Sequence, residues 1–239
     1  MRAAPARRMS RLLGILQLEN RPLTIPGSLG DARRFAYPAR GRTVPGAHVD
    51  AVVAGEPWLE AAYVAGARAL EADGATAIIT NCGFAILYQA AMSGAVRVPV
   101  AASSLLLLPL LAATLAPGRR IGLLTYDAAR LTARHLEAAG VTGADERLVV
   151  AGIEGTRSWA ALAEPVPDVG VESLAADVLG AVRKLRRAHP EVAVLLLECA
   201  AFCPVSSRVR TETGLPVLDF VSLADLVMAA APERRPEGD

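Results

Sequence analysis

AIITNC, at Ala77–Cys82, and VLLLEC, at Val194–Cys199, share one pattern: an apolar run that ends in a polar residue and a cysteine. Each run is continuous rather than alternating, which is typical of a strand buried on both faces of a parallel sheet. A second apolar run follows each cysteine, and Pro99 and Pro216 each lie 17 residues after their cysteine. The sequence therefore predicts two copies of one unit, each with a strand that ends in cysteine.

The same alternation of strand and helix extends along the chain. LLGIL at Leu12–Leu16 is similar to RIGLL at Arg120–Leu124, at the start of each copy. Apolar runs predict strands at residues 12–18, 76–80, 98–101, 121–125, 148–151, 192–197 and 216–220. Helical periodicity predicts helices at Glu60–Asp73, Ala128–Ala139 and Leu174–Ala188. We expect an α/β fold of two similar half-domains with parallel sheets.

These halves divide the chain into two lobes. We expect residues 1–105 and 219–239 to form the first lobe, with Cys82, and residues 106–218 to form the second, with Cys199. A pseudo-two-fold axis would relate the lobes. Because ligands of such sheets bind at the carboxyl ends of the strands, the active site should lie in the cleft between the lobes. Arg21–Pro45, rich in Pro and Gly, predicts a long ordered loop or lid.

Composition excludes several classes of function. The 239 residues are 53% hydrophobic, and 25 Lys and Arg balance 24 Asp and Glu. This near-neutral charge, with only 4% aromatic residues, argues against a nucleic-acid partner or an anionic membrane surface.

The apolar stretch Val98–Ala116 approaches the length of a membrane span, but it contains two prolines and two serines. A buried strand, a Ser-Ser turn and a core helix fit it better, so we expect no membrane association. The basic N-terminus has no small-residue cleavage site, and Met9 is a possible true start. A cytoplasmic location follows by default.

Three cysteines, Cys82, Cys199 and Cys203, do not make a disulfide framework, and a reducing compartment would keep them as thiols. None of the three histidines has ligand spacing with them. We therefore expect neither a metal nor another cofactor.

Two thiols that face each other across a cleft fit one kind of chemistry. Inverting a carbon next to a carboxylate needs one group to remove a proton from one face and another to deliver a proton to the opposite face. Cysteine suits both roles once its pKa is lowered enough to supply a thiolate. Cys82 and Cys199 are therefore the candidate catalytic pair, and the expected partner is a small substrate with a carboxylate.

Residues beside the cysteines and at other strand ends should complete the pocket. Glu198 precedes Cys199 and, in extended geometry, points away from it, so we expect it to be solvated or to support the site from outside. Arg33 and Arg34, in the long loop, are possible but weaker ligands for a carboxylate. The candidate substrate-binding residues are Asn81, Gly83, Phe84, Ser103, Ser104, Thr125, Tyr126 and Ala200.

The segments Thr80–Phe84, Leu197–Cys199 and Ser103–Leu105 resemble the aspartate/glutamate racemase superfamily, which includes hydantoin racemases, maleate isomerases and arylmalonate decarboxylases. The loop Pro26–Gly30 is also similar to one branch of this group, and the resemblance extends from about Leu12 to Val227. It implies two flavodoxin-like halves, proton transfer by both cysteines, no cofactor and no metal. It also implies that Thr125 and the groups around Ser104 bind carboxylate oxygens.

One departure bears on the substrate. Members often carry Thr directly after the second cysteine, where this chain has Ala200, followed by Ala201 and Phe202. The second half of the pocket is therefore more apolar, which favours a larger or less polar acid than an ordinary dicarboxylic amino acid. Both cysteines are present, whereas decarboxylases of this group use one.

The leading prediction is a cofactor-independent racemase or epimerase that acts on an amino acid, a hydantoin or a related acid, and is a homo-oligomer (a dimer or tetramer). One alternative is a maleate-type cis–trans isomerase that forms a covalent cysteine adduct. Another is a ligand-binding protein that keeps the fold without turnover.

Overall fold

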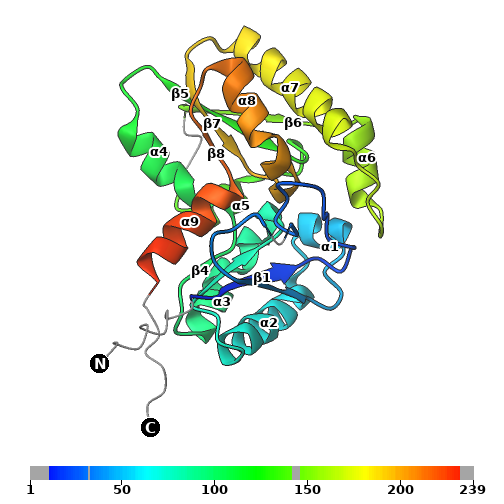
Figure 1. Cartoon of the computed structure of the whole chain (residues 1–239). Helices are drawn as coiled ribbons and strands as arrows, with labels where there is room; N and C mark the ends of the chain where they lie inside the picture. Colours follow the sequence, from blue (N-terminus) through cyan, green and yellow to red (C-terminus); the bar gives the residue numbers. More distant parts are fainter. Residues whose placement is uncertain (1–10, 32, 142–145, 232–239) are drawn as a thin grey trace, which may run out of the picture.

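The computed structural model describes residues 11–31, 33–141 and 146–231, and it contains two four-stranded parallel sheets (Figure 1). Met9 and the outermost ends of the expected first lobe lie outside the described residues. The first sheet comprises β1 (Leu13–Gln17), β2 (Ala39–Thr43), β3 (Ala77–Thr80) and β4 (Val100–Ala101). The second comprises β5 (Arg120–Thr125), β6 (Leu148–Gly152), β7 (Val192–Leu197) and β8 (Val217–Leu218).

The two sheets have the same strand order. It is β2-β1-β3-β4 in the first and β6-β5-β7-β8 in the second, and every pairing is parallel. β3 and β7, the strands that precede the two cysteines, therefore hold equivalent central positions. This arrangement confirms the predicted α/β fold of two similar halves.

Helices cover both faces of the sheets. α2 packs on the first sheet and α7 on the second, where buried Leu174, Val178 and Val182 recur along one face. The α-helices are α1 (Val49–Ala54), α2 (Glu60–Ala72), α3 (Gln89–Ala95), α4 (Leu108–Thr114), α5 (Ala133–Ala138), α6 (Arg157–Ala163), α7 (Val171–Ala188), α8 (Ser206–Thr213) and α9 (Phe220–Ala230). Short 3₁₀ helices are η1 (Pro57–Leu59), η2 (Gly83–Tyr88), η3 (Ser104–Leu107) and η4 (Ala200–Val205).

The core has two parts, one on each side of the sheets. Successive side chains of β3 point to opposite faces, so Ile78 belongs to one hydrophobic cluster and Ile79 to the other. On β7, Leu195 and Leu196 divide in the same way. Each cluster contains residues of both sheets, so the lobes share their apolar core.

The structure differs from the sequence-based expectation at β2. Ala39–Thr43 pairs with β1 inside the segment that the sequence predicts to be a loop. All five residues are exposed and two are arginines, so the strand has none of the apolar signal of the others. Because β2 lies at the sheet edge beside the buried strand β1, backbone hydrogen bonds to β1 are enough to hold it in the sheet without apolar side chains.

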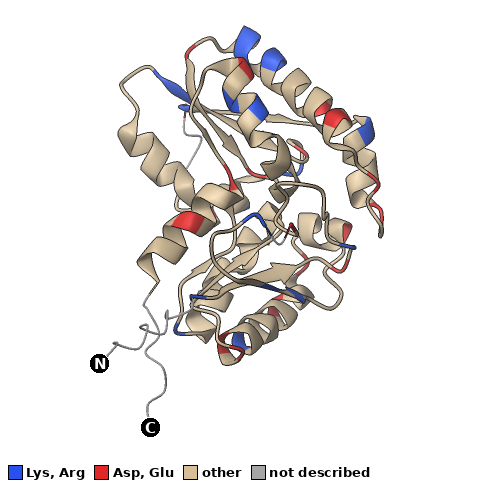
Figure 2. Ribbon diagram, viewed as in Figure 1, with Lys and Arg blue, Asp and Glu red and all other residues tan. Residues whose placement is uncertain are grey.

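The stretch Val98–Ala116 folds as the sequence predicts, into β4, η3 and α4. Within the part of the chain that the structure describes, no helix has the length and apolar character needed to cross a bilayer. Charged residues of both signs occur on α2, α7 and α8 (Figure 2).

α9 joins the two halves at the end of the described chain. It follows β8 of the second sheet and packs against β3 and β4 of the first (Figure 1). Buried Asp219 begins the helix by accepting hydrogen bonds from the backbone N–H groups of Val221 and Ser222. The hydroxyl of buried Ser206, at the start of α8, donates to the same carboxylate. The lobe boundary at residues 105 and 219 stays a prediction.

We predict that Ser206→Ala lowers the free energy of unfolding by about 1–3 kcal/mol, because it leaves one oxygen of a buried carboxylate without its partner. The matched control is Ser207→Ala, one residue along on the exposed face of α8. Urea denaturation of both variants measures the difference. Equal midpoints for the two variants would show that the Ser206–Asp219 hydrogen bond does not stabilise the junction.

Candidate active site

Cys82 and Cys199 hold equivalent places in the two halves. Cys82 follows β3 and directly precedes η2, and Cys199 follows β7 and directly precedes η4. Both residues are half-buried and neither is in a disulfide. Parallel strands place their carboxyl ends at one edge of each sheet, so the repeat brings both cysteines to the boundary between the lobes.

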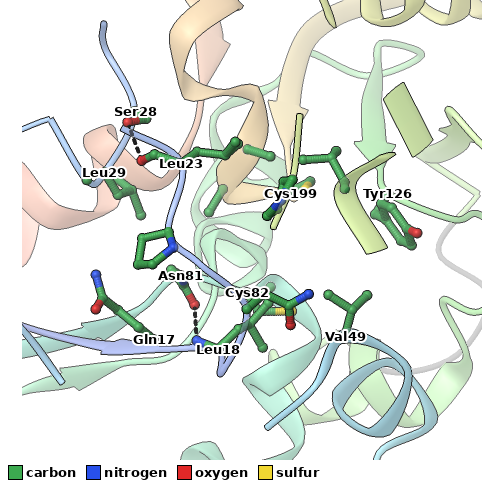
Figure 3. Close-up of a pocket in the computed structure, with 18 of the residues that line it drawn as sticks. Gln17, Leu18, Leu23, Ser28, Leu29, Val49, Asn81, Cys82, Tyr126 and Cys199 are labelled. Carbon is green, nitrogen blue, oxygen red and sulfur yellow. Dashed lines mark hydrogen bonds between the residues drawn. The ribbon is translucent and has the colours of Figure 1, made fainter. Parts of the chain in front are cut away.

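Both cysteines line one cavity (Figure 3), whose volume accessible to the centre of a water molecule is about 100 Å³. Among the predicted site residues, those that line it are Asn81, Cys82, Gly83, Phe84, Tyr126, Cys199 and Ala200. Residues that the sequence did not single out for this cavity are Gln17, Leu18, Asn20, Arg21, Pro22, Leu23, Ser28, Leu29, Gly30, Val49, Val53, Leu162, Pro167, Glu198 and Ala201.

Three predicted ligands, Ser103, Ser104 and Thr125, do not line the cavity. All three are fully buried and their hydroxyls are already used inside the protein. Ser103 accepts a hydrogen bond from the backbone N–H of Leu105, and Ser104 donates to the backbone oxygen of Leu197. Each hydroxyl therefore satisfies a buried backbone or side-chain group, and the expectation that these residues bind a carboxylate stays a prediction.

Asn81 also has a structural partner. Its side-chain oxygen accepts a hydrogen bond of 2.9 Å from the backbone N–H of Leu18, which directly follows β1 (Figure 3). Asn81 thus fixes the end of one strand against the next, beside the first cysteine.

The thiols are not pre-ionised. Burial and, to a lesser extent, the nearby carboxylate of Glu198 raise the pKa of the Cys82 thiol to about 12, and the backbone N–H groups of Phe84 and Ala85 partly oppose this rise. Burial also raises the pKa of Cys199 well above its ordinary value, with added effects of Glu198 and Cys82. An apolar cavity that already holds one carboxylate disfavours a second negative charge. The lowering of a thiol pKa that proton transfer would need stays a prediction.

Glu198 is the main correction at this site. The sequence predicts a solvated or outlying side chain, yet the residue is 0% exposed and lines the cavity. Its Oε2 accepts a hydrogen bond of 2.7 Å from the hydroxyl of Thr125, while Oε1 is buried without a hydrogen-bond partner among the described residues. Burial raises the pKa of this carboxyl to about 7, and hydrogen bonds from Thr125 and the backbone of Tyr126 only partly oppose the rise.

Gly83 makes room for this carboxylate. A Cβ atom at residue 83 would overlap Oε1 of Glu198, which comes from the other lobe. The residue after Cys82 must therefore be glycine for Glu198 to lie where it does. Glu198 thus lies against the residue that follows Cys82, and its charge opposes the ionisation of both Cys82 and its own neighbour Cys199.

Aromatic rings and one arginine complete the wall. Tyr126 stacks on Trp159 with ring centroids 5.9 Å apart, and its hydroxyl donates to the backbone oxygen of Trp159. Exposed Arg21 is among the residues that line the cavity, whereas Arg33 pairs with Asp31 and does not line it. Only the fold, which returns the loop after β1 to the cavity, identifies Arg21.

Cys203 lies outside the cavity, buried near Asp219, and burial raises its pKa. No three His, Cys, Asp or Glu side chains of the described residues are grouped as metal ligands would be.

No protein-family model matches the chain. A dimethylsulfoniopropionate lyase from Durusdinium sp. clade D is 28% identical over 219 residues, which cover 89% of this chain and 72% of that protein. Dimethylsulfoniopropionate lyases 5 and 3 from Emiliania huxleyi are 30% and 27% identical over 69% and 91% of this chain. The matches cover 35% and 59% of those two proteins, so the chain spans only part of their length.

Solved structures show the same fold. An allantoin racemase from Klebsiella pneumoniae has a TM-score of 0.61 at 18% identity, and the match covers 96% of this chain and 97% of that one. Unliganded arylmalonate decarboxylase has a TM-score of 0.56 at 19% identity, with 93% of both chains covered. The chain has the fold of the aspartate/glutamate racemase superfamily. This confirms the fold that the sequence resemblance implied.

The raised pKa of Glu198 has a consequence for stability. The folded state holds the proton up to about pH 7, whereas an ordinary Glu loses it near 4.5, so burial of this carboxylate destabilises the fold as the pH rises between these values. We predict that the free energy of unfolding of Glu198→Gln rises relative to wild type by up to about 3 kcal/mol from pH 4.5 to 8.

Urea denaturation at several pH values measures this, with the exposed Glu137→Gln as a matched control for the loss of one negative charge. If the difference in free energy of unfolding between Glu198→Gln and wild type does not change with pH, the raised pKa of the buried Glu198 carboxyl is contradicted.

Proposed function

We propose that the chain is a cofactor-independent lyase. In this proposal it removes the proton next to the carboxylate of a small acid and releases a leaving group from the following carbon. Several dimethylsulfoniopropionate lyases align with 88–91% of the length of this chain, and this similarity supports the reaction. Those relatives are enzymes by name, and the identities of 26–30% leave the substrate of this chain to experiment.

The observation that carries the proposal is the placement of two thiols and one carboxylate in a single, largely apolar cavity. Racemisation, decarboxylation and elimination can each pass through a carbanion next to a carbonyl group. A site that excludes water strengthens the interaction of a base with the acidic C–H group. Cys82 or Cys199, once ionised, is within the cavity that would hold that carbon.

The reaction needs no external reductant or oxidant. A cysteine thiolate takes the proton from C2, and the electron pair of the C–H bond becomes the second bond between C2 and C3. The bond from C3 to the leaving group breaks, and the leaving group departs with that electron pair. When the leaving group is a sulfonium, it departs as a neutral sulfide and needs no proton from the enzyme.

The cavity has a suitable group for each end of such a substrate. Arg21 lines the cavity, and its guanidinium could bind a carboxylate through a bidentate hydrogen bond. Phe84 and Tyr126 also line the cavity, and an aromatic face attracts a sulfonium or ammonium cation. The buried carboxylate of Glu198 adds a negative charge that favours the same cation.

A racemase or epimerase is the second candidate. The equivalent positions of Cys82 and Cys199, on strands β3 and β7 of matching sheets, favour it, because inversion needs a proton donor on the face opposite the base. The two reactions share their first step. They differ in whether a leaving group departs or a second thiol returns a proton.

We predict that the purified protein releases dimethyl sulfide from 3-dimethylsulfoniopropionate, measured by gas chromatography. Cys82→Ser and Cys199→Ser should each lower kcat by at least about 100-fold if both thiols take part in proton transfer. Cys203→Ser, outside the cavity, should retain the wild-type rate.

Solvent deuterium that appears at the carbon next to the carboxylate, without loss of a leaving group, would favour the racemase instead. A covalent cysteine adduct with an unsaturated diacid would favour the cis–trans isomerase. Ligand binding without either reaction would indicate a binding protein. Wild-type activity in both serine variants would rule out Cys82 and Cys199 as catalytic residues.

A further inference from the structure

The loop that follows β1 contributes one wall of the cavity. Pro22, Leu23, Ser28, Leu29 and Gly30 of this loop are among the residues that line it. Leu29 is buried and Leu23 is half-buried. These two leucines are the largest side chains of the five, so they set how far this wall extends toward the two cysteines.

The start of this loop is fixed to the second lobe. The side-chain amide of Asn20 donates hydrogen bonds of 3.2 Å and 2.8 Å to the backbone oxygens of Ala163 and Glu164, at the end of α6. The backbone N–H of Arg21 donates a hydrogen bond of 2.8 Å to the backbone oxygen of Pro165. These bonds hold the loop beside the cavity, which both lobes line.

The loop also meets the second lobe further along the chain. Gly27 has a φ of +84°, and a Cβ atom at this position would lie 3.4 Å from Cα of Pro204 in η4. Asp31 fixes this turn, because its carboxylate accepts a hydrogen bond of 3.1 Å from the backbone N–H of Gly27. Leu23 therefore lies between two contacts with the second lobe.

A buried hydrogen bond holds the two leucines in a fixed relation. Ser28, which is 2% exposed, donates a hydrogen bond of 2.7 Å to the backbone oxygen of Leu23 (Figure 3). A Cβ atom at Gly30 would overlap the same oxygen, so the chain on both sides of Leu29 lies against Leu23. Moving the leucines apart would break a buried hydrogen bond, which makes this wall stiff.

We propose that Leu23 and Leu29 form a size filter, which admits small molecules to Cys82 and Cys199 and excludes bulkier ones. A stiff, closely packed wall resists extra carbon atoms, because room for them requires shifts of side chains and backbone. The cavity volume of about 100 Å³ accessible to the centre of a water molecule suits a small acid. In the lyase, and here the inference rests on the proposed function, the filter limits the size of the leaving group.

Two iodoacetamides of different size test the filter without a substrate. Iodoacetamide and N-cyclohexyl-2-iodoacetamide form the same bond from sulfur to carbon and release iodide, so the ratio of their rates does not depend on how much thiolate is present. The ratio uses the initial rates of total alkylation at Cys82 and Cys199, measured by peptide mass spectrometry, and is divided by the ratio for free glutathione. We predict that the wild type prefers the smaller reagent about 10- to 100-fold.

Leu23→Ala and Leu29→Ala should each lower this preference at least about threefold, and the double variant should lower it to below about threefold. The matched control is Leu215→Ala, because Leu215 is a half-buried leucine outside the cavity. This control should keep the wild-type preference.

Equal normalised rates of the two reagents in the wild type would overturn the filter, and this result needs no variant. A preference that is unchanged in the folded double variant would also overturn it.

The leaving group is tested separately. The release of sulfide from 3-dimethylsulfoniopropionate should exceed that from 3-diethylsulfoniopropionate at least about 10-fold in kcat/KM, and the double variant should narrow this difference. If neither compound reacts while the reagent preference holds, the proposed lyase function fails and the filter stands. If both compounds react equally well in the wild type, the lyase stands and the filter on its leaving group fails.

Discussion

The buried carboxylate of Glu198, packed against Gly83 across the lobe boundary, is the contact on which the site depends. It follows β7 of the second sheet, and its neighbour Gly83 follows Cys82 after β3 of the first. Thr125, the last residue of β5, fixes its orientation. The carboxyl ends of β3, β5 and β7 thus meet at the carboxylate of Glu198. That charge and the apolar wall together keep both thiols protonated in the resting protein.

Much of the fold follows from the sequence because the parallel strands are continuous apolar runs. The matched spacing of Cys82 to Pro99 and of Cys199 to Pro216 reflects two sheets of identical order. β2 was not predictable in this way, because an exposed edge strand with two arginines needs no apolar residues. The helix predicted at Ala128–Ala139 is longer than the observed α5, which begins at Ala133, because the residues before Ala133 form a turn.

The site was less predictable than the fold, for physical reasons. The strand-end rule places Cys82, Cys199 and their neighbours near the cavity, yet it does not say which hydroxyls face inward. The hydroxyl of Ser103 accepts a hydrogen bond within its own turn, and the hydroxyl of Ser104 donates one to the backbone of the opposite lobe. The direction of Glu198 depends on the change from strand to 3₁₀ helix at Cys199, which an extended-chain argument does not capture.

Both candidate reactions need a sulfur atom that faces the reacting carbon, and the racemase needs a second sulfur in the same cavity. A short bifunctional reagent, 1,3-dichloroacetone, tests this geometry directly, since its three carbons can join only thiols that face one space. We predict one bridged product that links the peptides of Cys82 and Cys199, seen by mass spectrometry and lost in either serine variant. Separate single additions at the two cysteines, with no bridge, would contradict the shared cavity and with it the proposed chemistry.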